Sequence, residues 1–270
     1  MTHRPPLPLW SRALHRAVPL ALSTLSALGL SAHAASFTPL GQEASVVVNA
    51  RLQAADPLTG TIASAAFADQ LNAPLAPDEP ATLNLGLAGQ LPDHPDYSAF
   101  AQGRAQMHAG ISAGLIHFTG SSDMNVSGGF NGFGAVPEGD GFADVRWTGR
   151  FSLDEASVVH LHMRSTAAFI DSPDFHFSLT RLDGDVVWNS VLDEDPLGFP
   201  TRQVQEDFHL TAGDYQVTTW LHADSLLRGD VQRAGNTTGE FILRPVPEPA
   251  TWVMLGAGLG LVGWHARRTR

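Results

Sequence analysis

Apolar and polar residues alternate along much of the chain from residue 45 onward, and this period of two limits the folds that it can adopt. The clearest stretch is DVRWTGRFSL at 144–153, where every second position apart from one glycine is apolar: Val145, Trp147, Phe151 and Leu153. A strand with this pattern buries one face and exposes the other, which is typical of antiparallel sheets. The sequence therefore predicts an antiparallel β protein.

The same alternation recurs in the stretches 45–53, 82–88, 158–164 and 174–179. The central region has no convincing amphipathic helix of the kind found in soluble domains. Strands separated by glycine-containing turns indicate a β-sandwich or a jelly roll. We expect one all-β domain of this kind at 35–245, because its first half alone has too few large apolar residues to build a core.

Two short segments have the composition of tight turns between paired strands. Asp183 and Gly184 separate two apolar stretches and form a two-residue hairpin signal. The segment TAGDYQV at 211–217 predicts a second hairpin, which would join the strands on either side of it. By contrast, 54–80 and 125–141 are rich in proline or glycine, and we expect irregular segments there.

The region 35–247 is strongly acidic, with 26 acidic and 10 basic residues and hence a net charge of −16. Its basic residues are all arginines, and the chain contains neither lysine nor cysteine. Nucleic-acid binding needs clustered cations against phosphates, so this balance argues against it. Without disulfides the domain must be held together by its core alone, which about 200 residues can supply.

Residues 1–34 have the order of charged and apolar residues that is typical of a secretory signal peptide. A start that contains arginine and no acid is followed by the apolar run AVPLALSTLSALGL at 17–30. Ala32 and Ala34 supply the small side chains that signal peptidase accepts, so we expect cleavage between Ala34 and Ala35. This segment would form a helix, direct export and then be removed.

A second apolar run of about 15 residues, Ala250–Trp264, precedes a group of arginines. As a helix it would rise about 22 Å, which is less than the ~30 Å hydrocarbon core of a bilayer. Arg267, Arg268 and Arg270 would remain in the cytoplasm, in agreement with export of the preceding domain. We therefore expect a short transmembrane helix that serves as a temporary anchor.

The segment 246–270 resembles the PEP-CTERM sorting signal of Gram-negative bacteria. The resemblance rests on Pro247, Glu248 and Pro249, on the apolar run after them and on the arginine cluster, which occur in this order. It implies processing by an exosortase, followed by release or surface attachment, often in bacteria that make extracellular polysaccharide. An ordinary C-terminal anchor with a single span is the alternative interpretation.

Four histidines of the central region are candidates for a metal site. His160 and His162 share the outward face of one expected strand, and His176 and His209 also face outward on theirs. Imidazoles on one face can converge on a metal ion if their strands are neighbours. Scattered surface histidines are the alternative, and we expect no cofactor.

Trp188 and Trp220 are candidates for contact with a polysaccharide, because an exposed indole ring can stack on a sugar ring. The acidic groups at 183–185 and 193–195 do not match a calcium-binding loop, and we interpret them as solvated turns. The sequence contains neither a G-x-S-x-G nor an H-E-x-x-H motif. It therefore offers no catalytic signature.

Together these observations favour a non-enzymatic protein that is exported to the cell surface or beyond, with a structural or adhesive domain for the envelope or extracellular matrix. A carbohydrate-binding module for extracellular polysaccharide is the first alternative, and a hydrolase that uses loop carboxylates is the second. The expected partners are signal peptidase, an exosortase, the membrane around the C-terminal helix and extracellular polysaccharide.

Overall fold

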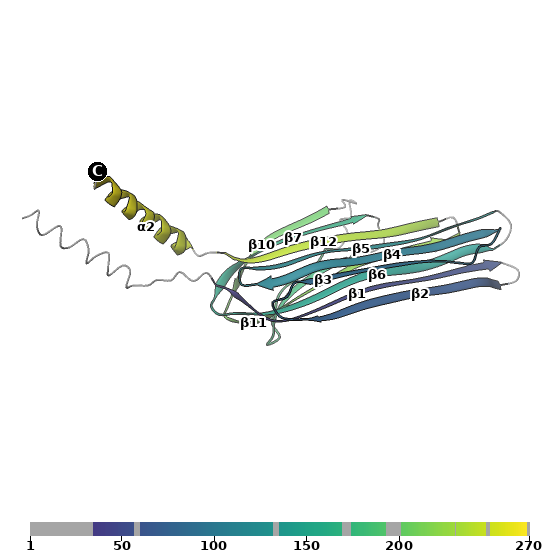
Figure 1. The fold of residues 1–270 in the computed structure, drawn as a ribbon, viewed down its shortest axis with the longest axis horizontal. Coiled ribbons are helices and arrows are strands. Elements are labelled where there is room, and N and C mark those ends of the chain that lie inside the picture. Colours follow the sequence, from purple (N-terminus) through teal and green to yellow (C-terminus); the bar gives the residue numbers. More distant parts are fainter. Residues whose placement is uncertain are drawn as a thin grey trace, which may run out of the picture. The chain divides into compact units, whose positions relative to one another are not determined.

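The computed structural model describes residues 35–56, 60–131, 135–168, 174–192, 201–229, 231–246 and 249–268. These residues form antiparallel strands followed by a helix (Figure 1). The elements are β1 (Phe37–Asp56), β2 (Gly60–Leu75), β3 (Ala81–Gln90), β4 (Tyr97–Ser112), β5 (Leu115–Phe130), β6 (Val136–Leu153), β7 (Ser157–Ala168), β8 (Asp174–Arg181), β9 (Val186–Leu192), β10 (Thr201–Leu210), β11 (Gly213–Arg228), β12 (Val231–Val246) and α2 (Pro249–Arg268).

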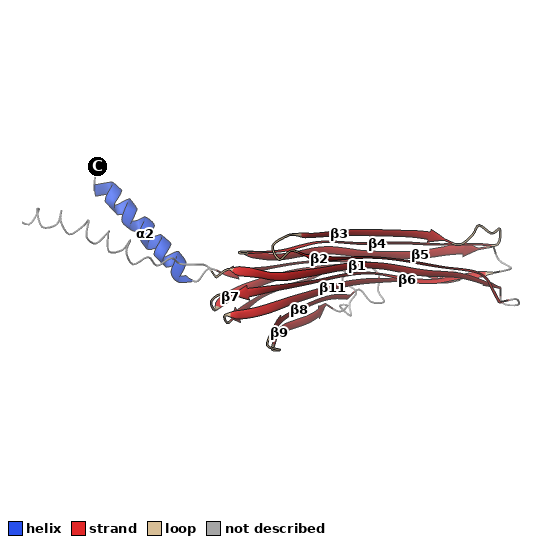
Figure 2. Ribbon diagram, turned by 60° about the horizontal axis from the view of Figure 1, so that its bottom comes forward, coloured by secondary structure: helices blue, strands red, loops and turns tan. Residues whose placement is uncertain are grey.

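The strands form two antiparallel layers. Sheet I has the order β2-β1-β6-β11-β8-β9, and sheet II has the order β3-β4-β5-β12-β7-β10. Among the described strands, ladder pairing continues from one sheet to the other where Leu226–Arg228 of β11 pairs with Val231–Arg233 of β12. In Figure 2, β3, β4 and β5 lie in one layer and β11, β8 and β9 in another.

Aromatic side chains from both sheets fill the space between them. The ring of Phe241 in sheet II lies 4.7 Å from Phe177 and 5.9 Å from Trp147 in sheet I, measured between centroids. Phe118 of sheet II stacks on Phe241 at 5.8 Å. Burial of such rings is the main favourable contribution to a core without disulfides. The predicted antiparallel, sandwich-like all-β domain is therefore confirmed.

The predicted inward faces of the strands are buried. On β6 the inward residues Val145, Trp147, Phe151 and Leu153 are at most 1% exposed. The corresponding residues of β1, β7 and β8 are buried as well. Asp144 lies on the opposite, outward face of β6, but neighbouring side chains cover it and leave it only 8% exposed.

Both predictions of irregular segments were wrong over most of their length. The region 54–80 contains β2, and the region 125–141 contains the end of β5 and the start of β6. Small side chains do not interrupt backbone pairing, so alanine-, serine- and glycine-rich stretches can extend a ladder that large neighbours stabilise. Pro74 is tolerated because it lies next to the last residue of β2, which pairs only with β1 among the described strands.

Of the two predicted hairpins, one is present. Asp183 and Gly184 lie in the turn between the paired strands β8 and β9, and Gly184 has a φ of +109°, a value that favours glycine. The hairpin at 211–217 was wrong, because β10 pairs with β7 in sheet II whereas β11 pairs with β6 and β8 in sheet I. This turn therefore carries the chain from one layer to the other.

Helix α2 includes the whole apolar run that was predicted to be helical. It begins at Pro249, a residue suited to the first position of a helix, and Arg267 and Arg268 are exposed in its last turn. None of the helices in the described part of the chain combines the length and the hydropathy of a membrane span. Pro247, Glu248 and Arg270 lie outside the described residues.

The predicted signal peptide, with Ala32 and Ala34, also lies outside the described residues. Ala35 is the first residue that the structure describes, and it packs against the core of the sandwich. The chain divides into a unit at 1–33 and a unit at 34–270.

Candidate functional site

The first and the last strand leave the sandwich at the same end. Phe37, at the start of β1, pairs with Leu153, and Val246, at the end of β12, pairs with Val158. Only four residues separate Leu153 from Val158 along the chain. The segment before β1 and the segment after β12 therefore emerge close together, and we call this end of the sandwich the terminal end.

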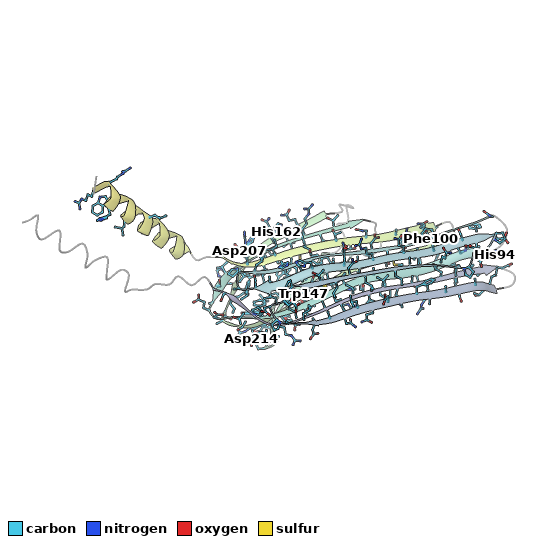
Figure 3. The ribbon with its side chains drawn as sticks, in the orientation of Figure 1. His94, Phe100, Trp147, His162, Asp207 and Asp214 are labelled. Carbon is cyan, nitrogen blue, oxygen red and sulfur yellow. The ribbon has the colours of Figure 1, made fainter. Side chains whose placement is uncertain are left out.

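The loops at the terminal end are acidic. The Arg181 guanidinium forms an ion pair with Asp183, at 3.1 Å, in the β8–β9 turn. Figure 3 shows Asp214 at this end of the molecule, with His94 and Phe100 at the opposite end. The exposed carboxylates in the loops and strand starts of the terminal end are Asp78, Glu79, Asp154, Glu155, Asp183, Asp185 and Asp214.

The structure brings three of the four candidate histidines onto one face of sheet II. The Nδ1 atom of His160 lies 2.6 Å from Oδ1 of Asp207 on β10, and Nε2 of His162 lies 2.9 Å from Nε2 of Gln203. Figure 3 labels His162 and Asp207. His209 lies on the same face, opposite Val158 in the register of β10 and β7. These contacts cross-link an outer strand of the sheet to its neighbour.

His176 lies apart from the other three, on β8 of sheet I, where its ring is 4.8 Å from that of Trp220. The four histidines therefore do not converge on one point. Within the described ranges there is no group of three or more His, Asp or Glu side chains that could hold a metal ion.

Trp188, one of the two candidate tryptophans, packs at the edge of the sandwich. Its ring is 5.5 Å from that of Phe177 on β8 and 5.8 Å from that of Phe208 on β10. It therefore bridges strands of the two sheets and contributes to the core, which leaves less of its ring for contact with a ligand.

Trp220 lies on the outer face of sheet I in a network of aromatic and charged groups. The Arg146 guanidinium lies 5.4 Å from the centre of its ring, and His222 lies 5.4 Å away on the same strand. Nδ1 of His222 is 2.6 Å from Oδ1 of Asp144, whose other oxygen is 3.6 Å from Arg146. This network explains why a carboxylate on an outward face is buried.

A cavity of about 1030 Å³ continues from this network along β6 and β11. Phe142 connects the two, because its ring stacks on His222 at 6.1 Å and also lines the cavity. We call this space the β11 cavity. Its other lining residues are Asp140, Gly141, His222, Asp224, Ser225, Leu226, Gln232, Arg233 and Ala234.

The β11 cavity exists because β11 changes neighbours along its length. It pairs with β8 as far as His222 and with β12 from Leu226 onward, so the residues between have no paired strand on that side among the described residues. β12 then crosses to sheet II at Gly235. A Cβ atom there would overlap the Asp224 carbonyl oxygen, so the crossing requires glycine.

The outer face of sheet II carries a shallow groove on the other side of the molecule, lined largely by polar side chains. It consists of two adjoining hollows, of about 470 and 290 Å³, that share Thr119, Gly120 and Thr238. Asn84 and Gln106 line the larger hollow, together with neighbouring hydroxyl groups. This groove has no aromatic ring other than that of a histidine among its lining residues.

The sequence predicted one residue of the network around Trp220, but neither the β11 cavity nor the groove on the outer face of sheet II. Trp220 was singled out, but Asp140 and Asp224 were not, since they become neighbours only through the pairing of β6 with β11. The glycine at 235 was the available signal, because an isolated glycine within a strand indicates close backbone approach.

Comparison with known protein families matches residues 245–269 to the PEP-CTERM protein-sorting motif. The resemblance seen in the sequence is therefore confirmed, and the chain carries the signal of an exported protein that is directed to an exosortase. None of the curated proteins compared with the chain matches it.

Three similar solved structures cover larger parts of the chain at low scores. They are the CBM22-1 xylan-binding domain of Xyn10C from Paenibacillus barcinonensis (14% identity, 47% of this chain and 74% of that one, TM-score 0.23), isomalto-dextranase of Arthrobacter globiformis T6 (11%, 58% and 36%, TM-score 0.23) and VP2 of infectious bursal disease virus (7%, 80% and 68%, TM-score 0.18). Scores this low assign neither a fold family nor a function.

Proposed function

We propose that this chain is exported through its N-terminal segment, held briefly in the inner membrane by α2 and then released by an exosortase, so that the sandwich acts at the cell surface or outside the cell. Signal peptidase would cleave between Ala34 and Ala35, and the exosortase would act near Pro247, Glu248 and Pro249. The observation that carries this proposal is the sorting motif at 245–269, which begins where β12 ends.

The position of the two ends of the sandwich supports this order of events. Strand β1 starts and strand β12 ends at the terminal end. In the proposal, each of these two strands is connected to a segment that inserts into the membrane. A domain with this topology can be tethered at both ends without any rearrangement of its sheets. Loss of the N-terminal tether would leave α2 as the temporary anchor.

The charge of the terminal end supports release rather than permanent attachment. Its exposed carboxylates would face the outer surface of the inner membrane and repel any anionic group there within about a Debye length, roughly 8 Å at physiological salt. Once α2 is severed, the exposed carboxylates in the described loops of this end would oppose renewed contact with the bilayer. The arginines at 267, 268 and 270 would remain with the discarded helix.

Outside the cell we assign the sandwich a structural or adhesive role, without catalysis. A second role, binding of extracellular polysaccharide, is favoured by one specific observation: the β11 cavity joins the aromatic ring of Phe142 to the hydrogen-bonding groups of Asp140 and Asp224. A pocket with apolar surface and a few convergent polar groups is a typical ligand site.

The test is the mass of the mature protein, isolated from cells that contain an exosortase and from the same strain without it. We expect a chain that starts at Ala35 and lacks α2 in the first strain, and a membrane-bound chain that retains α2 in the second. Retention of the helix in both strains, with normal export, would contradict the proposal.

A further inference from the structure

The β11 cavity is preorganised by the buried network beside it. Asp144 is 8% exposed and holds Nδ1 of His222 at 2.6 Å, while the ring of His222 stacks on Phe142 at 6.1 Å. A ring fixed in this way presents its remaining surface to a ligand without losing much rotational freedom on binding. The cavity therefore has a rigid aromatic wall.

Hydrogen-bonding groups of two kinds and one apolar side chain surround this wall. Asp140 and Asp224 supply carboxylate oxygens, Gln232 supplies an amide, and Leu226 adds an apolar side chain between them. Asp224 lies opposite Phe142 in the register of β11 and β6, and Asp140 lies opposite Leu226, so the two carboxylates are diagonal neighbours on adjacent strands. Together these groups can accept and donate hydrogen bonds around one ring-sized ligand.

A sugar ring matches this arrangement in shape and chemistry. It has an apolar C–H face that can stack on an aromatic ring and vicinal hydroxyl groups that can donate to a carboxylate. The size is sufficient for more than a monosaccharide, since ligand pockets typically measure about 300–1,000 Å³ and this cavity is about 1030 Å³.

The charge of the site selects among saccharides. The cavity lining carries two carboxylates and one guanidinium, that of Arg233, in a region with a net charge of −16, so its charge balance is negative and would repel the carboxylate or sulfate groups of an anionic polymer. From this we infer that the β11 cavity binds a segment of a neutral polysaccharide, with Phe142 as the stacking ring and Asp140 and Asp224 as hydroxyl acceptors. This inference rests on the proposed function, which brings the domain into contact with extracellular polymers.

The groove on sheet II provides a matched control surface. Its lining side chains are largely polar, it lies on the opposite sheet, and its lining residues differ entirely from those of the β11 cavity. If neutral polysaccharide bound through hydroxyl and amide groups alone, this groove would be the better site. Variants in the two places therefore separate the inferred site from general adhesion to a polar sheet.

The experiment uses the exported protein purified from its producing cells, in affinity electrophoresis through gels that contain cellulose derivatives, xylan, dextran or galactomannan, with alginate as the anionic polymer. We expect retardation by at least one neutral polymer and none by alginate. Phe142→Ala and Asp140→Asn should each weaken retardation about tenfold or more, whereas the double variant Asn84→Ala/Gln106→Ala should leave it unchanged.

The outcomes are distinct from those of the sorting experiment. Normal export and processing without retardation by any of the neutral polymers would overturn the inferred site and leave the proposed sorting intact. Retardation by alginate alone, or loss of binding only in the sheet II variant, would also overturn it. Because Phe142→Ala could alter folding, each variant is checked by circular dichroism, and Asp140→Asn, a conservative change at an exposed position, is the deciding variant.

Discussion

Gly120 of β5 lies directly opposite Gly239 of β12, and the side chain of Leu221 from sheet I occupies the space beneath both. A Cβ atom on Gly120 would lie 2.7 Å from Leu221 Cδ1, and one on Gly239 would lie 2.8 Å from Leu221 Cδ2. The glycine pair thus lets the two sheets approach closely at this point. The glycine pair also lies under the groove on the outer face of sheet II, because Gly120 lines both of its hollows.

Gly239→Ala should destabilise the domain by about 1–3 kcal/mol, because the added methyl group overpacks a full core. The measurement is the free energy of unfolding in urea. Gly86→Ala is the control, since a Cβ there meets nothing within 4 Å, and it should be neutral or slightly stabilising.

The role of Leu221 can be tested in the same series. Leu221→Ala alone leaves a cavity and should cost about 2–5 kcal/mol. Combined with Gly239→Ala, it should cost less than the sum of the two single changes, because the methyl group added at position 239 can occupy space that the Leu221 side chain leaves. Strict additivity would show that the close approach of the sheets does not depend on this contact.

Gln42→Ala should destabilise the domain more than an ordinary surface change, by about 1–3 kcal/mol. The Gln42 side chain is buried, accepts a hydrogen bond from Trp147 Nε1 at 3.2 Å and donates to the carbonyl oxygens of Pro77 and Glu79 at 2.8 and 3.1 Å. Its loss leaves a buried indole N–H without an acceptor. Chemical denaturation is the measurement, and Gln53→Ala, at an exposed position, should change stability by no more than about 0.5 kcal/mol.

The sequence predicted those parts of the fold that depend on local pattern. Alternation along β6 and β7 identified the buried face correctly, because every strand of a two-layer sandwich has one covered face. The β8–β9 turn was predictable since Asp183 and Gly184 fit a two-residue loop. The C-terminal sorting motif was predictable because its residues are contiguous.

Strand order was not predictable, and the errors follow from that. Nothing local distinguishes a turn that closes a hairpin from one that crosses between sheets, so the connection at 211–217 was misassigned. The same limitation applies to sites. His160 and Asp207 are far apart in the sequence, and their contact depends on the register of β7 with β10.

Replacement of His117 should make stability less dependent on pH. Burial, and then the positive charge of His108, lower the pKa of His117 below its ordinary value of 6.5. The folded state thus disfavours the charged imidazole, so the contribution to stability is fully present above pH 6.5 and is lost as the pH falls towards the lower pKa of the folded state.

Urea unfolding of the wild type and of His117→Gln at pH 7.5, 6.5 and 5.5 measures this effect. The difference in stability between pH 7.5 and 5.5 should be smaller in the variant. His209→Gln, at an exposed position of the same sheet, serves as the control. An unchanged profile in His117→Gln would show that this imidazole is not a source of the acid sensitivity.

Insertion of Gly-Ser-Gly-Ser between Val246 and Pro247 should accelerate removal of α2. Val246 still pairs with Val158, and only residues 247 and 248 separate it from the first residue of the helix. A protease needs an extended stretch of substrate, so the end of β12 must detach before cleavage. Among the described strands, β12 pairs beyond Leu243 with β7 alone. Detachment of its last residues breaks a ladder hydrogen bond, which costs about 1 kcal/mol. A linker that removes this cost should raise the rate of α2 removal about fivefold, measured by pulse-chase conversion of the precursor.

The same insertion after Asp183, in a turn at the same end of the sandwich, is the control and should leave the rate unchanged. Equal rates in all three proteins would mean that exosortase access is not limited by the last strand.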